Sequence, residues 1–257
     1  APGLVARVEY SNEVWNGLFE QAQYAREKGK ALNLSSNEFE AQLRYYSKRS
    51  VEIFKIWEQV FTENGAKPEG LARMQRVLSA QAASPGTSSI VLAYEDAYKH
   101  TDALAIAPYF GQIITTADEA ALFKSYTREQ LVQRAWQELA EAVGNMGPHR
   151  KIADQYGVHL FAYEGGQHFL GILGQENDDA LNAVLMGLNQ DPVMRELYKS
   201  YLESWEAAGG EDFMLFNGLS RFSKWGSWGL LQSMDQDPAT AHKYMGVMDY
   251  LATQVPE

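Results

Sequence analysis

The sequence predicts an α/β fold built from parallel strands, and three observations support this expectation. Short β-rich runs alternate with helical segments along the chain, and the runs are brief and apolar, which is typical of parallel βα units. Glutamates, Glu13 and Glu164, lie at the ends of two of these runs. A carboxylate at the carboxyl end of a parallel strand lies where such folds place their chemistry. We expect five strands, within residues 4–10, 73–81, 102–110, 159–164 and 213–217.

The segments between these runs carry helical signals. From Phe39 to Phe61 apolar residues recur with helical spacing, and they predict a long helix that residues 64–65, Asn-Gly, would end. Thr127 and Gln130 form a capping box before the apolar pattern that begins at Leu131. Asp-Pro pairs at residues 191–192 and 237–238 predict the starts of two further helices. Gly-Gly at residues 209–210 is expected to end the first of these two.

The composition limits the classes of protein to consider. At 257 residues the chain can form one large α/β domain, and with no internal repeat or composition break we expect a single domain over residues 1–257. The formal net charge of −11 argues against nucleic acid as a partner and suits a neutral ligand. No apolar run reaches the roughly 18 residues of a membrane helix, so no membrane partner is expected. The absence of cysteine excludes disulfides and thiolate metal sites.

The first candidate motif surrounds Glu13, in Tyr-Ser-Asn-Glu-Val-Trp-Asn. A retaining glycosidase needs an acid that protonates the leaving oxygen and an amide that holds the sugar's 2-hydroxyl group, and Glu13 and Asn12 supply both residue types. Trp15 adds an aromatic surface for sugar binding. The alternative interpretation is that Asn12 caps a helix starting near Val14 and that Glu13 favours the positive end of that helix.

The second candidate motif is Ala-Tyr-Glu-Gly-Gly-Gln-His, which contains Glu164. A nucleophilic carboxylate needs close access to the anomeric carbon, and the two glycines would let backbone pass near the ligand. Tyr163, Gln167 and His168 can donate hydrogen bonds that keep Glu164 ionised, and Gln167 and His168 are also predicted to bind the substrate. The alternative is a tight strand-to-helix turn in which His168 is a hydrogen-bonded structural residue.

Aromatic residues in glycine-rich segments are candidate sugar platforms. Trp225 and Trp228 lie in Ser-Lys-Trp-Gly-Ser-Trp-Gly, which cannot form a helical core stripe. Flat indoles suit the apolar C–H faces of sugar rings, although a loop that plugs the end of the fold would look the same. Tyr109, in Ala-Pro-Tyr-Phe-Gly, can reach the same site or simply pack at its strand end.

Other chemistries lack their sequence patterns. The five histidines show no metal-binding spacing, so no metal is expected, and no nucleophile elbow, P-loop or dinucleotide-binding fingerprint is present. We therefore expect no cofactor.

With these motifs in place, the chain resembles the (β/α)8 glycoside hydrolases of the large retaining superfamily, which carry the acid/base after strand four and the nucleophile after strand seven. Asn12-Glu13 resembles the Asn-Glu acid/base pair of that superfamily, and Glu164 takes the place of the nucleophile three strands later. Trp225 or Trp228 resembles the platform tryptophan after strand eight, and Tyr109 resembles a tyrosine that approaches the nucleophile. The same blocks also look like those of bacterial proteins labelled cellulose-binding or uncharacterised hydrolases.

The resemblance implies a partial, five-stranded TIM-barrel-like domain equivalent to strands four to eight, with strands one to three absent. It implies a retaining β-glycosidase that acts on a β-linked polysaccharide such as cellulose or another β-glucan, with a carbohydrate as its partner and a secreted or periplasmic location. The chain opens Ala-Pro-Gly without a signal segment, which fits a mature, trimmed or cytosolic protein. Alternatives are a non-catalytic carbohydrate-binding protein and an assembly subunit of a larger enzyme. Because the first strand has a bare edge, we expect a homodimer or association with a separate N-terminal fragment.

Overall fold

The structure, a computed structural model, describes residues 4–63 and 73–254. The chain folds into two compact units, each assembled from segments that are distant in sequence. Unit 1 comprises Ala1–Ala107, Gly147–Tyr163 and Gly210–Asp212, and unit 2 comprises Pro108–Met146, Glu164–Gly209 and Phe213–Glu257. The single domain over residues 1–257 stays a prediction.

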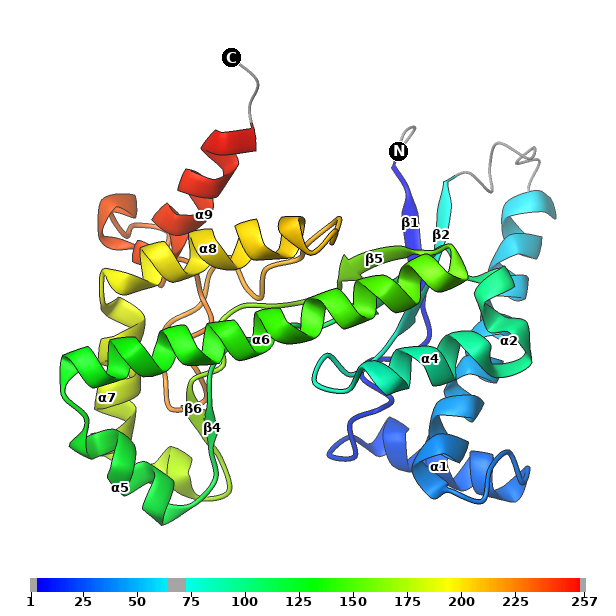
Figure 1. Cartoon of the computed structure of the whole chain (residues 1–257), viewed down its shortest axis with the longest axis horizontal. Coiled ribbons are helices and arrows are strands. Elements are labelled where there is room, and N and C mark those ends of the chain that lie inside the picture. Colours follow the sequence, from blue (N-terminus) through cyan, green and yellow to red (C-terminus); the bar gives the residue numbers. More distant parts are fainter. Residues whose placement is uncertain (1–3, 64–72, 255–257) are drawn as a thin grey trace. The chain divides into compact units, whose positions relative to one another are not determined.

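Unit 1 is built on a four-stranded parallel sheet (Figure 1), which confirms the α/β class with parallel strands. Its strands are β1 (Ala6–Glu9), β2 (Met74–Ser79), β3 (Ala103–Ile106) and β5 (His159–Ala162), and they pair in that order. All three pairings are parallel, with Glu9 opposite Val77, Val77 opposite Ala103, and Ala105 opposite Phe161. Four of the five predicted strands are therefore confirmed in position.

The two faces of this sheet differ in side-chain size. One face carries Leu78, Leu104 and Leu160, which are fully buried. The opposite face carries the small residues Ala103 and Ala105, which form one hydrophobic cluster with Val77 and Phe161. This alternation follows from the period of two along a strand.

Side chains from the first and last strands of the sheet meet on the face that carries Ala103 and Ala105. The Arg7 guanidinium of β1 lies 4.5 Å from the centre of the Phe161 ring of β5, and it also pairs with Asp212. On a flat sheet these strands would be separated by three spacings, about 14 Å. The register also puts Arg7 four residues, roughly 13 Å, before the level of Phe161, so the total separation would exceed the reach of the two side chains. The contact therefore indicates a curved sheet.

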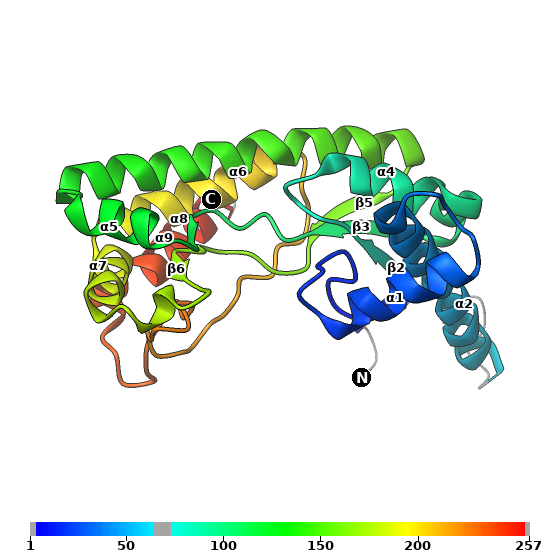
Figure 2. The ribbon, with the colours of Figure 1, turned by 90° about the horizontal axis from the view of Figure 1, so that it is seen from below.

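The helices of unit 1 are α1 (Glu20–Ala31), α2 (Glu38–Glu63), α4 (Pro85–Ala93), the 3₁₀ segment η1 (Tyr94–His100) and the later part of α6 (Arg128–Tyr156). Helix α1 packs against α2 (Figure 2). The long helix predicted from Phe39 to Phe61 is confirmed, but its apolar stripe is buried only as far as Phe54, at Leu43, Tyr46 and Phe54. Farther along, Trp57 and Val60 are 43% and 46% exposed. The predicted stop at residues 64–65 lies outside the described residues.

The fifth predicted strand, residues 213–217, is wrong. Backbone hydrogen bonds place the preceding residues beside β5 instead: Glu211 N–H donates to the Leu160 carbonyl and Ala162 N–H donates to the Asp212 carbonyl, both at 2.9 Å. Phe213 belongs to unit 2, where its ring lies 5.1 Å from that of Tyr201. Phe213, the first residue of the predicted strand, therefore packs against an aromatic ring of unit 2 instead of pairing in the sheet.

Unit 2 is mainly helical. Its elements are β4 (Ile113–Ile114), α5 (Ala117–Ser125), the first part of α6, β6 (Leu170–Gly171), η2 (Gln175–Asn177), α7 (Asp179–Gln190), α8 (Val193–Ala207), η3 (Pro238–Thr240) and α9 (His242–Gln254). The two-residue strands β4 and β6 pair in parallel. Helix α8 packs against α9 and buries Tyr198, Tyr201 and Trp205.

Helix starts follow the predicted side-chain signals, with one correction. At α6, Gln130 N–H donates to the Thr127 hydroxyl at 3.3 Å and Thr127 N–H donates to the Gln130 side chain at 2.8 Å, which confirms the capping box. At α8, Val193 N–H donates to Asp191 at 2.9 Å. The pair at residues 237–238 starts the short η3, and α9 begins only at His242. None of the described helices is long and apolar enough to cross a membrane.

Candidate functional site

Glu13 lies in the loop that follows β1, four residues beyond the last residue of the strand. The loop is conformationally strained, because φ is +65° at Ser11 and +44° at Glu13, and neither is glycine. Left-handed backbone at ordinary residues is uncommon and is concentrated at functional sites. Contrary to the alternative sequence interpretation, no helix starts at Val14, since the first helix begins at Glu20.

Two side chains hold the half-buried Glu13 carboxylate. The Tyr163 hydroxyl donates to Oε1 at 3.1 Å, and the Asn16 amide donates to Oε2 at 2.9 Å. Tyr163 follows β5 by one residue. The carboxylate after β1 is therefore tied to the carboxyl end of β5, within unit 1.

The neighbours of Glu13 have different environments. Asn12 is exposed, and its carbonyl accepts a hydrogen bond from the Gln21 side chain at 2.7 Å. Trp15 is half-buried, and its indole Nε1 is buried without a hydrogen-bond partner among the described protein residues. A buried donor left unpaired costs about 1–3 kcal/mol, so this N–H is suited to an oxygen acceptor from water or ligand.

A further carboxylate, Glu9, lies at the end of β1 and was not predicted as a site residue. Glu9, the last residue of the strand, accepts a hydrogen bond from the Ser79 hydroxyl at 2.5 Å, and Ser79 N–H donates to the Tyr46 hydroxyl at 2.8 Å. Burial raises the pKa of Tyr46, so its phenol stays protonated. The signal for Glu9 was its place in the strand alternation, on the same face as Arg7.

Glu164 lies two residues beyond the end of β5 and is half-buried. The chain passes from unit 1 to unit 2 between Tyr163 and Glu164. The following Gly165 is required by packing, because a Cβ there would lie 2.5 Å from the Phe213 ring and 2.7 Å from the Tyr201 hydroxyl. This packing explains Gly165 without a ligand, whereas the sequence predicts ligand access as the role of both glycines.

An aromatic cluster in unit 2 brings together three of the sequence-predicted site residues, Tyr109, His168 and Trp228. The Tyr109 and His168 rings are 4.9 Å apart, and the Trp228 ring is 5.1 Å from His168 and 5.9 Å from Tyr109. Phe216 joins at 5.7 Å from Trp228. Burial lowers the pKa of His168 to about 4, so its imidazole is neutral near pH 7 and offers hydrogen bonds rather than charge.

Residues 223–228, here called the tryptophan loop, present Trp225 to solvent. Trp225 is 65% exposed, and the Lys224 ammonium lies 4.7 Å from the centre of its ring. The Trp228 indole N–H donates to the Trp225 carbonyl at 3.1 Å, which links the two tryptophans. An exposed indole beside a half-buried one is an arrangement that suits stacking of a sugar ring.

Gln167 has a supporting position rather than an exposed one. It is 1% exposed, its side-chain amide donates to the Ser227 carbonyl at 2.9 Å, and its side-chain oxygen accepts from Phe169 N–H at 2.9 Å. Its polar atoms are thus engaged in holding the tryptophan loop. A direct role of Gln167 in substrate binding stays a prediction.

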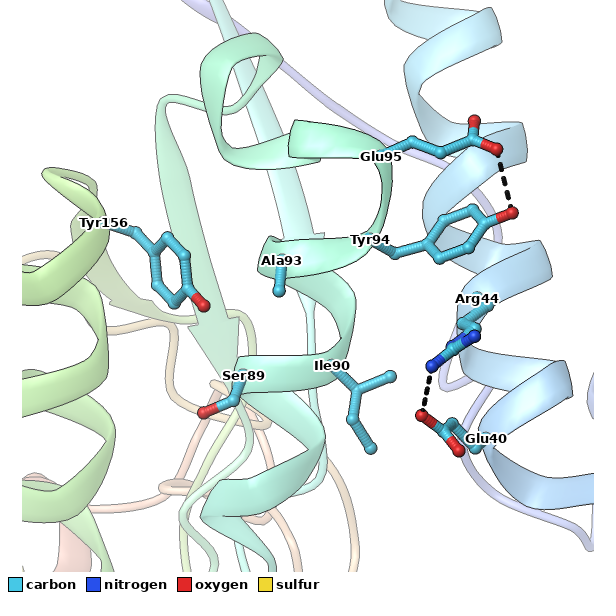
Figure 3. Close-up of a pocket in the computed structure, with 8 residues that line it drawn as sticks. All are labelled: Glu40, Arg44, Ser89, Ile90, Ala93, Tyr94, Glu95 and Tyr156. Atoms are coloured by element: carbon cyan, nitrogen blue, oxygen red, sulfur yellow. Dashed lines mark hydrogen bonds and ion pairs between the residues drawn. The ribbon is translucent and has the colours of Figure 1, made fainter. Parts of the chain in front are cut away.

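A pocket of about 420 Å³ lies elsewhere in unit 1, and none of the sequence-predicted site residues lines it (Figure 3). Its polar groups pair with one another: Arg44 with Glu40 at 2.6 Å, and the Tyr94 hydroxyl with Glu95 at 2.9 Å. The rest of the lining comes from α4 and the end of α6: Ser89, Ile90, Ala93 and Tyr156. The pocket therefore lacks a free catalytic pair.

Among the described residues no group of three His, Asp or Glu side chains could hold a metal ion.

Comparison with protein-family models, with curated proteins and with solved structures finds no match to this chain.

Proposed function

We propose that this chain is a retaining β-glycoside hydrolase that acts on a β-linked polysaccharide such as cellulose or another β-glucan. The observation that carries the proposal is the position of Glu13: a carboxylate after β1, in a strained loop, hydrogen-bonded to Tyr163 at 3.1 Å. Tyr163 directly precedes Glu164, the second strand-end carboxylate. Paired carboxylates are the chemical requirement of glycoside hydrolysis.

In the proposed reaction Glu164 is the nucleophile and Glu13 the acid/base. The Glu164 carboxylate attacks the anomeric carbon and forms a glycosyl ester, while protonated Glu13 gives its proton to the leaving glycosidic oxygen. Glu13, now ionised, then takes a proton from water, and the resulting hydroxyl displaces Glu164 from the sugar. This mechanism requires the two carboxyl groups to be roughly 5–5.5 Å apart.

The proposal includes a specific fold, part of a (β/α)8 barrel. The strand order β1-β2-β3-β5 follows the sequence, and residues 210–212 continue it beside β5. Consecutive parallel strands with a curved sheet are the pattern of a (β/α)8 barrel. We assign the chain to strands four to eight of such a barrel. Because its polysaccharide substrates lie outside the cell, a secreted or periplasmic location goes with this proposal.

Substitution of the two glutamates tests the proposal. Glu164→Gln is expected to lower turnover of β-glucan by at least roughly 10³-fold while leaving binding intact, because it removes the nucleophile. Glu13→Gln is expected to lose activity on the polysaccharide but to keep a fast first step on an aryl β-glucoside, whose leaving group needs no acid. Glu203→Gln, an exposed glutamate on α8, is the matched control and should keep the wild-type rate. Wild-type turnover by the Glu164 variant would disprove the assignment.

A non-catalytic carbohydrate-binding protein is the second candidate, and the aromatic cluster favours it independently of either glutamate. Trp225 and Trp228 can bind a sugar ring without any acid nearby. Incubation with β-glucans, xylan and mannan separates the candidates, with reducing ends and pull-down measured together. Binding that Trp225→Ala abolishes, without release of reducing ends, would favour this second function.

A further inference from the structure

Lys243, in the first turn of α9, is buried without a carboxylate partner among the described residues. It is 1% exposed, and its Nζ donates to the Asn189 side-chain oxygen at 3.2 Å and to the Ser227 carbonyl. The amine also lies 4.3 Å from the centre of the Phe222 ring. Fully buried lysines are rare and are normally paired with an acid, so this one needs an explanation.

The amine is part of a network that holds the tryptophan loop. The Ser227 carbonyl, which accepts from Lys243, also accepts from the Gln167 amide at 2.9 Å. Asn189 connects the two donors, since its amide donates to the Gln167 oxygen at 3.3 Å. Ser227 directly precedes Trp228, whose ring lies 5.1 Å from that of His168, so the network holds the backbone next to this ring.

Three features disfavour the charged form of Lys243. The side chain is removed from water, no carboxylate contacts it among the described residues, and it lies at the positive end of the α9 dipole. Burial lowers its pKa to about 7. On the neighbouring helices Arg195 pairs with Asp249 and Asp191 pairs with Arg128. In the tryptophan loop the Lys224 ammonium donates to the Asn177 side chain at 2.9 Å, and His242 precedes Lys243 in the sequence.

We propose that Lys243 is the positioning residue of the tryptophan loop and that its proton state controls how firmly the loop is held. The neutral amine holds Ser227 most firmly, and protonation weakens the hold on the loop. The sign follows from linkage: a proton binds more tightly to an amine that has reached water than to a buried one, so protons favour the open loop. The consequence for sugar binding rests on the proposed function, whereas the loop movement itself does not.

Amide hydrogen exchange of residues 223–231, corrected for intrinsic rates, measures loop opening without any ligand. Ser223 and Gly226 are suitable reporters, because each amide donates to the other's carbonyl, at 3.1 and 3.0 Å. One proton is taken up on opening, so the wild-type protection factor should rise about tenfold per pH unit from pH 7 to 9. It should level off below pH 7. The rise should be absent in Lys243→Met and in Lys243→Gln, neither of which titrates.

The variants separate the amine from general destabilisation. Lys243→Gln keeps a donor toward Ser227 and is expected to protect the loop more than Lys243→Met does. Lys199→Met, a half-exposed lysine on α8 that pairs with Glu203, and His242→Gln, the neighbouring imidazole, should keep the wild-type slope. A flat wild-type profile, or an equal slope in the Lys243 variants, would overturn the proposal. If the methionine variant does not fold, the wild-type profile and the glutamine variant still decide.

Repeating the exchange with soluble β-glucan separates this inference from the proposed function. If the loop is a sugar platform, the glucan raises the protection of residues 223–231. A pH slope that depends on Lys243, with no effect of the glucan, would contradict the sugar site and leave the positioning role of Lys243 in place.

Discussion

At the scale of single residues, His168 has the environment with the clearest measurable consequence. Its ring lies within 5.1 Å of the Tyr109 and Trp228 rings, and burial lowers its pKa from 6.5 to about 4. The unfolded chain therefore binds a proton between these pH values when the folded chain does not. The contribution of His168 to the free energy of unfolding is therefore fully present above pH 6.5. It should be lost as the pH drops toward 4, which lowers the free energy of unfolding by about 3 kcal/mol.

Denaturant unfolding of the wild type and His168→Gln at pH 7, 6, 5 and 4 tests this prediction. The variant should lose less stability over that range, because glutamine does not titrate. Acidic groups and His149, whose pKa burial also lowers, act equally in both proteins, so the difference isolates His168. His100→Gln, a histidine of unit 1, serves as the control. Parallel pH profiles of wild type and His168→Gln would contradict the prediction.

Gly165 is a second residue whose environment makes a definite prediction. A methyl group there would lie 2.5 Å from the Phe213 ring and 2.7 Å from the Tyr201 hydroxyl, both closer than van der Waals contact. Gly165→Ala should lower the free energy of unfolding by roughly 1–3 kcal/mol. Gly187→Ala is the matched control, because its Cβ would meet no described atom within 4 Å and alanine favours the helix by about 1 kcal/mol. Equal stability of the two variants in urea unfolding would disprove the packing argument.

At the scale of elements, the capping box of α6 combines sequence signal and observed geometry. The Thr127 hydroxyl accepts the Gln130 amide at 3.3 Å at the start of a helix of 29 residues. Thr127→Ala should lower the free energy of unfolding by about 1 kcal/mol, because a first-turn amide loses its acceptor. Thr62→Ala, whose hydroxyl donates to carbonyls near the end of α2, should change it by less than about 0.5 kcal/mol. Thermal and urea unfolding measure both values.

At the scale of the whole molecule, the open edge of β1 predicts assembly. Among the described residues β1 pairs only with β2, and Leu4 and Val5 beside it are 65% and 48% exposed. Unpaired strand edges promote association, so we predict a homodimer or a complex with a separate N-terminal fragment. The Arg7–Asp212 ion pair offers an internal way of closing the same edge and would make a monomer adequate.

Light scattering at micromolar concentration decides between these states. A dimer should give twice 28.8 kDa, and Val5→Lys should return it to the monomer mass, since a charged edge resists pairing. Leu122→Lys, at an exposed site on α5, should leave the dimer intact. A wild-type mass of 28.8 kDa with no partner chain would exclude this assembly.

Local sequence patterns were enough to predict the parallel α/β class, the positions of four strands, the long helix α2 and the start of α6. These features depend on patterns within a few residues, namely strand length, helical spacing and side chains that cap their own helix. The placement of Glu13 and Glu164 after strands could be predicted for the same reason.

Features that depend on residues far apart in the chain become visible only when the chain is folded. Residues 213–217 read as a strand, but Phe213 packs on Tyr201, and residues 210–212 take the place beside β5. Gln167 and Lys243 meet at the Ser227 carbonyl from segments about 60 and 16 residues away, which no local pattern reveals. Burial of such polar groups is stabilised only by partners that folding brings together, and therefore the supporting network of the candidate site could not be predicted from the sequence.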